Sequence, residues 1–326
     1  SRRRDERAEE MFDIQVCGLS QRMRFIGARH AVIGISGGLD STLALLVTVA
    51  TFDAMGLPRE GIIGVTMPGL GTSTHTKDNA LELMNRLGIT SLTIDITEAC
   101  LQHFAAIGHD PQVQDVVYEN TQARERTQIL MDLANKYNAP VIGTGDLSEL
   151  ALGWCTYNGD HMSMYSVNAG VPKTAVQIIV SRLAEIERFG AELSDVLRSI
   201  VATPISPELK PTDEAGGIDQ KTEDLVGPYE LHDFFLYNFL GYGYDPEKIF
   251  YLAKVAFEGK YEPKVIKRWL REFYRRFFAQ QYKRNCMPDG PKVAAVSLSP
   301  RGYWRMPSDV SPKAWLAAVD AISDED

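Results

Sequence analysis

The segment with the clearest chemical potential is Ser36-Gly-Gly-Leu-Asp-Ser-Thr42, which combines two glycines with three hydroxyl side chains and one carboxylate. A buried strand is predicted directly before it, at residues 31–36, and a helix directly after it. At such a turn, free backbone N–H groups and the helix dipole point at one spot, and glycines let phosphate oxygens approach. The segment therefore predicts a phosphate-binding turn, with an ordinary glycine-rich turn as the alternative.

Asp40 lies in the middle of this turn. A carboxylate repels phosphate unless a cation neutralises it, and Mg²⁺ binds both groups through oxygen. We therefore expect Asp40 to be a Mg²⁺ ligand, directly or through water, with a simple helix N-cap as the alternative. The turn is not a Walker A loop, because its spacing differs and no lysine follows it.

Strands alternate with helices over the first 200 residues. Strands are predicted at residues 31–36, 61–67, 91–96 and 139–144, and helices at 8–28, 40–49, 77–87, 116–137, from 147, and at 172–189. This alternation predicts an α/β fold, a doubly wound parallel sheet covered by helices on both faces. Thr144 should end the fourth strand at the same sheet edge as the phosphate turn, where such sheets bind ligands.

The chain changes character after residue 200. Residues 203–228 contain four prolines and a Gly-Gly pair, which predicts an extended loop or linker. Helices are predicted at residues 231–242, 246–257 and 263–283. We divide the chain into a core with an N-terminal helix at 1–200, and a linker with a helical C-terminal extension, packed on the core, at 201–326. Lys and Arg side chains along the last helix form either a solvated face or an anion or partner contact.

The composition limits the partners. The formal charge of the 326 residues is −9, which argues against nucleic acid because phosphate backbones select for clustered positive charge. No apolar run approaches the roughly 20 residues that span a bilayer. The four cysteines are scattered, without zinc spacing, and fit a reducing cytosol. We expect a cytoplasmic protein that binds neither nucleic acid nor membrane.

Further motifs follow the turn in a fixed order. They are Tyr118-Glu-Asn-Thr-Gln-Ala-Arg124, Gly143-Thr-Gly-Asp-Leu-Ser-Glu149, Gly159-Asp160, Val167-Asn-Ala-Gly-Val-Pro-Lys-Thr174 and Thr203-Pro204. The turn resembles that of the pyrophosphate-loop ATPase superfamily, and the order of motifs resembles NAD synthetase. The continuation at residues 227–233, 281–284 and 288–292 is similar to the synthetase domain of the glutamine-dependent form. This resemblance implies an adenine nucleotide alpha hydrolase-like fold.

The resemblance also implies an activity. It is that of a ligase forming a carbon–nitrogen bond, which amidates nicotinic acid adenine dinucleotide to NAD with ATP and Mg²⁺. The reaction passes through an acyl-adenylate, uses ammonia as the nucleophile, and releases AMP and pyrophosphate. A homodimer with the dinucleotide site at its interface is implied. Full glutamine-dependent enzymes carry a glutaminase, for which this chain has no room, so we expect a fragment or an ammonia-dependent form.

The resemblance assigns roles to individual residues. The implied catalytic residues are Asp40, Glu149 and Lys173, and the implied metal ligands are Asp40 and Glu149. The implied ATP-binding residues are Gly34, Ile35, Ser36, Gly37, Gly38, Leu39, Asp40, Ser41, Thr144, Lys173 and Thr203. The implied residues for the deamido dinucleotide are Asn120, Arg124, Glu149, Trp154, Asp160 and Lys283.

Several of these residues have a structural alternative. Asp146-x-x-Glu149 has the spacing of a capping box, which can coexist with metal binding. Lys173 lies at a helix start, where the dipole disfavours a cation, so a bound phosphate explains it better than an exposed, idle side chain. Asn120 and Arg124 are four apart on one helical face, so a local polar pair is possible.

Two regions leave the details open. Trp154 is either an aromatic platform for a ring of the substrate or part of the core, and residues 156–172 read as an irregular, lid-like loop. Residues 67–75 lack a basic residue that the ammonia-dependent relatives have, so the contacts to adenine are open. A different acceptor, as in GMP synthetase or a tRNA-thiolating enzyme, and a nucleotide-binding sensor without turnover are the competing functions.

Overall fold

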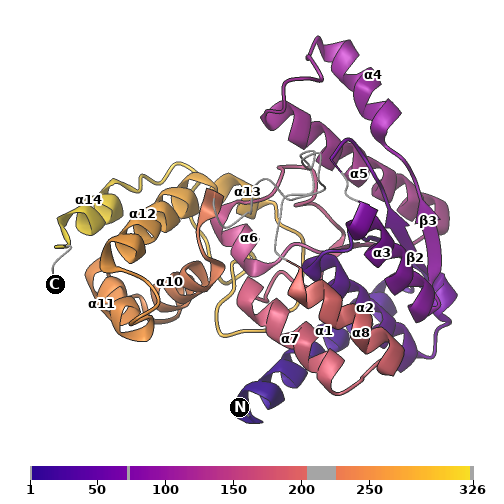
Figure 1. Ribbon diagram of the computed structural model, residues 1–326, viewed down its shortest axis with the longest axis horizontal. Coiled ribbons are helices and arrows are strands. Elements are labelled where there is room, and N and C mark those ends of the chain that lie inside the picture. Colours follow the sequence, from indigo (N-terminus) through magenta and orange to yellow (C-terminus); the bar gives the residue numbers. More distant parts are fainter. Residues whose placement is uncertain (1, 72–73, 204–224, 324–326) are drawn as a thin grey trace.

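The computed structural model describes residues 2–71, 74–203 and 225–323. A five-stranded parallel sheet forms its centre, in the order β3-β2-β1-β4-β5 (Figure 1). The strands are β1 (Ala31–Gly34), β2 (Ile62–Thr66), β3 (Thr90–Thr93), β4 (Val141–Gly143) and β5 (Tyr165–Ser166). Because β1 pairs with both β2 and β4, the chain runs outward from β1 in both directions. The carboxyl ends of β1 and β4 therefore form the crevice where ligands bind in doubly wound sheets.

Helices cover both faces of the sheet. On one face α1 (Arg2–Ile26), α2 (Leu39–Met55), α3 (Thr74–Leu87), α7 (Lys173–Glu185) and α8 (Ala191–Ala202) pack together, and on the other α4 (Thr97–Ile107) packs with α5 (Val116–Tyr137) (Figure 1). A short 3-10 turn, η1 (Arg59–Gly61), precedes β2. The predicted α/β fold is confirmed, but α4 and α8 were not predicted. The prediction that residues 156–172 are irregular is wrong in part, since β5 lies there and pairs with β4.

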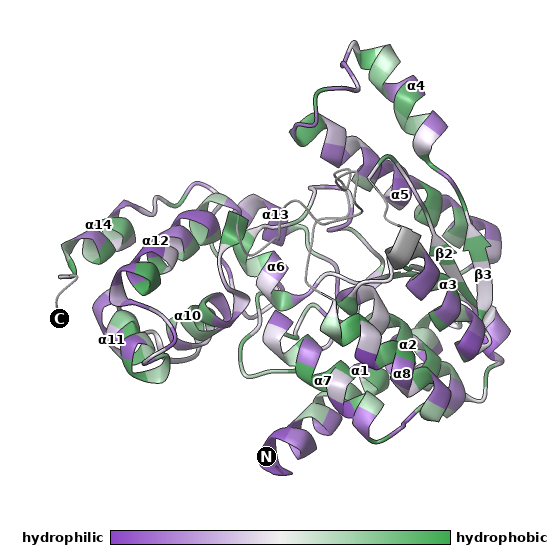
Figure 2. Ribbon diagram, viewed as in Figure 1, coloured by the Kyte–Doolittle hydropathy of each residue, from purple (hydrophilic) through white to green (hydrophobic). Residues whose placement is uncertain are grey.

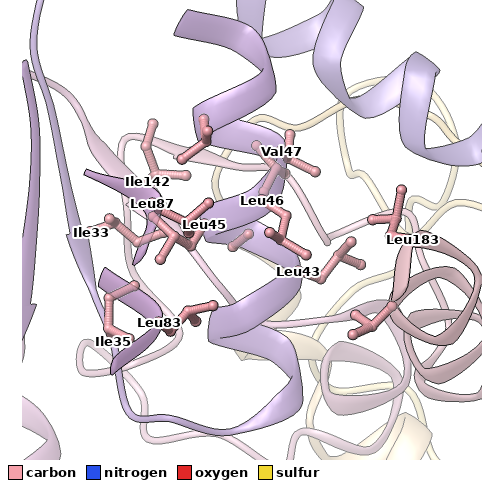
Figure 3. Close-up of a cluster of buried hydrophobic side chains, with 14 of the residues drawn as sticks. Ile33, Ile35, Leu43, Leu45, Leu46, Val47, Leu83, Leu87, Ile142 and Leu183 are labelled. Carbon is pink, nitrogen blue, oxygen red and sulfur yellow. The ribbon is translucent and has the colours of Figure 1, made fainter. Parts of the chain in front are cut away.

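Helix α2 is buried along most of its length. Leu43, Leu45, Leu46 and Val47 are fully buried, with Leu45 on the side of the sheet residue Ile33 and Leu43 on the side of Leu183 in α7 (Figure 3). A helix that is apolar on all sides belongs in the interior. Its packing fixes the N-terminus of α2, and with it the turn that follows β1.

The C-terminal extension is helical, as predicted. It consists of α10 (Tyr229–Tyr242), α11 (Pro246–Ala256), α12 (Pro263–Ala279), α13 (Gln281–Asn285) and α14 (Lys313–Ala321), of which α14 was not predicted and α13 was predicted as part of α12. It lies beside the sheet region (Figure 1), and its helices carry both hydrophobic and hydrophilic residues (Figure 2). The division of the chain at residue 200 stays a prediction, and the linker expected at 203–228 falls almost wholly outside the described residues.

Several basic side chains of α12 form ion pairs or hydrogen bonds with other residues of the extension. Arg271 pairs with Asp320 at 2.8 Å, and Arg276 pairs with Glu272 at 2.8 Å. Lys267 donates to the carbonyl of Ile322 at 2.7 Å. The contacts of Arg271 and Lys267 tie α12 to α14 and the residue that follows it, whereas the pair of Arg276 and Glu272 lies within α12. None of the described helices is both long and apolar enough to cross a membrane.

Candidate active site

The predicted phosphate turn connects β1 to α2. Gly37 has φ +92°, a backbone conformation that favours glycine. Gly38 is the N-cap of α2 and has no side chain to cap it, and its N–H donates to Ser36 Oγ at 3.1 Å. Ser41 Oγ donates to the carbonyl of Gly38 at 3.1 Å. The serines therefore hold the shape of the turn while the helix N-terminus stays open to an anion.

Asp40 is the second residue of α2, because the N-cap position belongs to Gly38. The alternative of a simple N-cap aspartate is therefore wrong. The predicted ATP-binding run begins at Gly34, the last residue of β1, continues through Ile35, and ends in the first turn of α2, which starts at Leu39. Contact of this run with ATP stays a prediction.

The predicted catalytic residues meet at one point. The ammonium of Lys173 contacts Asp40, lies 2.8 Å from Asp146 Oδ2 and 3.0 Å from Glu149 Oε1. These residues come from α2, from the start of α6 (Leu147–Leu152), and from the start of α7. The side chain of Lys173 is only 3% exposed, so the alternative of an exposed, idle lysine is wrong.

The electrostatics of this cluster follow from burial and from an excess of acid. Glu149 keeps 20% of its side chain exposed, yet the protein around it raises its pKa to about 7; burial contributes most, Asp40 adds to it, and Lys173 opposes it. Burial also raises the pKa of Asp146. Burial alone would lower the pKa of Lys173, but Asp146, Asp40 and Glu149 outweigh it and raise that pKa. Three carboxylates thus face one ammonium, which favours a further cation.

The carboxylates fit a divalent cation such as Mg²⁺. One oxygen from each of Asp40, Asp146 and Glu149 lies within 4.8 Å of the others. The buried Oδ1 of Asp40 has no hydrogen-bond partner among the described residues. Carboxylate oxygens are the ligands that Mg²⁺ prefers. The predicted roles of Asp40 and Glu149 as metal ligands stay predictions.

The capping box predicted at the start of α6 is present. Asp146 Oδ1 accepts from the Glu149 N–H at 2.8 Å, and Glu149 Oε2 accepts from the Asp146 N–H at 3.3 Å. The other carboxylate oxygen of Glu149 contacts Lys173. The cap therefore fixes the orientation of Glu149 without using both of its oxygens, so capping and ligand binding are compatible.

The two threonines predicted to touch ATP lie in different settings. Thr144 follows β4, and its carbonyl accepts from Asn168 Nδ2 at 3.0 Å, an amide that also donates to the Asp40 carbonyl at 3.0 Å. Asn168 thereby joins the first turn of α2 to the residue that follows β4. Thr203 caps the end of α8, where its hydroxyl donates to the Ser199 carbonyl at 3.0 Å. No hydrogen bond between described residues joins Thr203 to the phosphate turn.

A second group of predicted residues meets around residues 155–161. Thr156 Oγ1 donates to Asn120 Oδ1 at 2.8 Å, and Arg124 Nε donates to the carbonyl of Tyr157 at 3.3 Å. Thr156 N donates to Asp160 Oδ1 at 2.7 Å. Asn120 and Arg124 thus reach across to a facing segment, which does not support the alternative of a local pair.

Lys283 and Trp154 lie on the side of the extension. The ammonium of Lys283 donates to the carbonyls of Gly153 and Cys155 at 2.8 and 2.6 Å. Trp154 is half-buried against the apolar cluster of the extension, with the Arg276 guanidinium 5.2 Å from its ring centroid, which favours the core alternative. A cavity of about 20 Å³ lies between the cluster around Lys173 and the segment 155–161. Glu149, Asp160 and other residues line it.

Comparison with known proteins decides the family. Residues 12–276 match the sequence model of NAD synthase. The chain belongs to the NAD synthase family. It is 44% identical to the glutamine-dependent NAD(+) synthetase of Mycobacterium tuberculosis over 95% of this chain and 49% of the relative. It is 33% identical to that of Thermotoga maritima over 92% of this chain and 48% of the relative. The chain spans about half the length of these curated relatives.

A solved structure agrees on the fold. The crystal structure of a glutamine-dependent NAD(+) synthetase from Cytophaga hutchinsonii superposes with a TM-score of 0.76 and 21% identity, and covers 96% of this chain and 56% of that chain. At this identity the likeness speaks for the fold. The resemblance proposed from the motifs is confirmed at the level of family and architecture.

Asp146 belongs to the cluster with Lys173 but was predicted only as a helix cap, although it follows β4 as Asp40 follows β1. The carboxyl ends of neighbouring parallel strands share one edge, which is the signal that could have placed both carboxylates together. The contacts of Asn168 gave no such signal, because they join residues 24 and 128 positions apart.

Proposed function

We propose that the chain converts nicotinic acid adenine dinucleotide to NAD with ATP and ammonia, releasing AMP and pyrophosphate. The observation that carries this proposal is the meeting of Asp40, Glu149 and Lys173 beside an open helix N-terminus. Membership of the NAD synthase family supports the substrate, since the printed names of the relatives are those of NAD(+) synthetases.

The reaction has two steps. A carboxylate oxygen of the nicotinate attacks the α-phosphorus of ATP, and pyrophosphate leaves with the electrons of the α–β bond. Ammonia then attacks the acyl carbon, loses a proton, and expels AMP. No covalent bond to the protein is needed, so the chain acts by positioning and by stabilising charge.

The residues of the chain divide this work. Backbone N–H groups at the N-terminus of α2 would bind phosphate oxygens beside the turn at Gly37 and Gly38. Lys173 stays protonated because the carboxylates around it raise its pKa, and a permanent ammonium stabilises negative charge on phosphate. Asp40 and Glu149, with Asp146 beside them, would hold Mg²⁺, which would supply positive charge next to the phosphates.

The second group would bind the dinucleotide. Asn120 and Arg124 on α5 and Lys283 on α13 all bond the segment 155–161, which contains Asp160. Ammonia must be uncharged to attack, so it needs an enclosed site. The cavity of about 20 Å³ between Glu149 and Asp160 has room for a molecule of the size of water or ammonia.

We further infer a homodimer and a cytoplasmic location. The relatives are about twice as long as this chain and are glutamine-dependent by name. A glutaminase domain or subunit is therefore the source of ammonia that we propose for the complete system. Sedimentation of the purified chain measures the assembly, and a monomer at all concentrations would contradict the dimer.

One assay tests the function. The chain is incubated with the deamido dinucleotide, ATP, Mg²⁺ and ammonium, and the products are identified by mass spectrometry. We expect NAD, AMP and pyrophosphate in equal amounts. AMP formed with xanthylate and not with the dinucleotide would point to a different acceptor. Binding of ATP without AMP under any acceptor would point to a nucleotide sensor and would contradict the proposal.

A further inference from the structure

The C-terminal extension reaches the carboxylate and lysine cluster through a carboxylate of its own. Asp233, on α10, accepts from the Thr174 N–H at 3.0 Å and from the Thr174 hydroxyl at 2.7 Å. Its other oxygen accepts from Ser148 Oγ. Asp233 thus joins α10 to the starts of both α6 and α7. Neither of its oxygens contacts the cluster itself.

These bonds provide the cap that α7 lacks. The N-cap residue of α7 is Pro172, which offers no side-chain acceptor, although the first N–H groups of a helix need partners. The N–H of Lys173 donates to Ser148 Oγ at 2.8 Å, and the next N–H donates to Asp233. A carboxylate at a helix N-terminus is also favoured by the dipole. The extension therefore fixes the backbone of the lysine that the proposed reaction uses.

A second side chain of the extension contacts the opposite end of α6. Arg284, on α13, donates from Nη1 to the carbonyls of Leu150 and Ala151 at 3.1 and 3.0 Å. The side chain is fully buried, and its other N–H groups donate to Gln281 Oε1 and to the carbonyl of Phe277. Its partners are neutral oxygens, among them the last carbonyls of a helix, where the dipole favours a cation.

Helix α6 depends on such contacts because it is short. It has six residues, too few for a helix to be stable without packing, yet its first turn carries Glu149 and its N-cap is Asp146. Gly153 ends the helix with φ +61°, and a Cβ at this position would overlap the side chain of Gln280. The end of α6 therefore packs directly on the junction of α12 and α13.

We propose that Asp233 and Arg284 are positioning residues of the active site. Asp233 fixes the start of α7 and Arg284 fixes the end of α6, so that Lys173 and Glu149 meet Asp40 of α2. Neither residue touches the reacting atoms. The part of this inference that concerns catalysis rests on the proposed function, and the part that concerns nucleotide binding does not.

The test compares two variants with matched controls on the same extension. Asp233→Asn and Arg284→Met remove the proposed contacts, whereas Asp320→Asn and Arg275→Met make the same changes in exposed ion pairs. Binding of Mg²⁺ with α,β-methylene-ATP, which cannot be cleaved at that bond, is measured by calorimetry. We expect about tenfold weaker binding in the first pair and no change in the controls. We also expect a higher Mg²⁺ requirement for AMP formation, with the KM for the dinucleotide changing less than about threefold.

Two additions keep the result decisive. Arg284→Lys retains a buried cation and should restore part of the binding if Arg284→Met folds poorly. The double variant Asp233→Asn/Lys173→Met should form AMP at the rate of Lys173→Met alone, because Asp233 acts through Lys173. Multiplied losses, or wild-type binding in folded Asp233→Asn and Arg284→Met, would overturn the proposal. A wild-type chain that binds the analogue but makes no AMP would overturn the proposed function instead.

Discussion

The sheet region and the C-terminal extension have cores of different composition. Around the sheet the buried side chains are mostly Leu, Ile, Val and Ala, as on α2 and β1 (Figure 3). In the extension aromatic side chains are much more frequent among them, namely Tyr229, Phe235, Phe250, Trp269, Phe273, Tyr274, Phe277 and Phe278. Strands covered on both faces favour branched aliphatic residues. Each aromatic ring buries a large area, so a few of them contribute much of the core of a small helical region.

The two regions also use charge differently. The sheet region collects Asp40, Asp146, Glu149 and Lys173 at the carboxyl ends of β1 and β4. The extension pairs charges on its surface, as Arg271 does with Asp320, and directs Asp233 and Arg284 toward α6 and α7. One region thus carries the carboxylate and lysine cluster, and the other region bonds the helices α6 and α7 that present it.

The largest effect is expected from the aromatic core of the extension. Phe273 is fully buried and lies against Phe235, Phe239, Tyr274 and Phe277. Phe273→Ala should lower the free energy of unfolding by about 3–5 kcal/mol, because it leaves a cavity. Urea denaturation measures this change. A loss below about 1 kcal/mol would show that the aromatic core is not what stabilises this region.

The next effect is catalytic and belongs to the sheet region. Asp40→Asn should lower AMP formation by about 10²–10³-fold, since it removes a charged ligand at the site of reaction. The fold should remain intact, as judged by thermal unfolding. Asp53→Asn, on the exposed side of the same helix, is the matched control and should keep its activity. Near-normal pyrophosphate release from Asp40→Asn would contradict the assigned role.

The stability of the extension should depend on pH through one buried histidine, His232. Burial lowers the pKa of His232 to about 4. Below the ordinary pKa of histidine, His232 binds a proton in the unfolded chain but not in the folded chain. The free energy of unfolding therefore falls as the pH drops from about 7 to about 4. The loss from this residue should be roughly 3 kcal/mol, by the difference between the two pKa values. His232→Phe should flatten this part of the stability curve, whereas the exposed His103→Gln should leave it unchanged. An identical slope in His232→Phe would argue against burial as the cause.

The smallest effect is expected at the surface of the extension. Arg271→Ala breaks an exposed ion pair with Asp320 and should cost less than about 1 kcal/mol of stability. Thermal unfolding at low and high salt measures it. A loss of stability above about 2 kcal/mol would contradict the difference that we expect between exposed ion pairs of the extension and its buried charges.

Local signals explain what the sequence could predict. Helix α5 was predicted at its observed bounds, because Asp115 caps its start and Asn138 ends it with φ +49°. β5 was missed because two residues carry no alternating pattern. Asp40 was predicted as a metal ligand from its place in the phosphate turn, whereas the roles of Glu149 and Lys173 were implied by the resemblance to NAD synthetase.

The contacts of Asp233 and Arg284 could not be predicted from local sequence signals. Asp233 bonds Ser148 across 85 positions, and Arg284 bonds Leu150 across 134. Such partners become neighbours only when the extension packs on α6 and α7. The hydroxyl of Thr203 donates to the Ser199 carbonyl at the end of α8, and its contact with ATP, which the resemblance implies, stays a prediction.

We expect the cluster of Asp40, Glu149 and Lys173 to promote attack of a carboxylate on the α-phosphorus of ATP. Deamido dinucleotide with ¹⁸O in both carboxylate oxygens tests this step, because mass spectrometry can follow the label. We expect one ¹⁸O atom in the phosphate of AMP, one in the amide of NAD, and none in pyrophosphate. Unlabelled AMP formed together with NAD would contradict it.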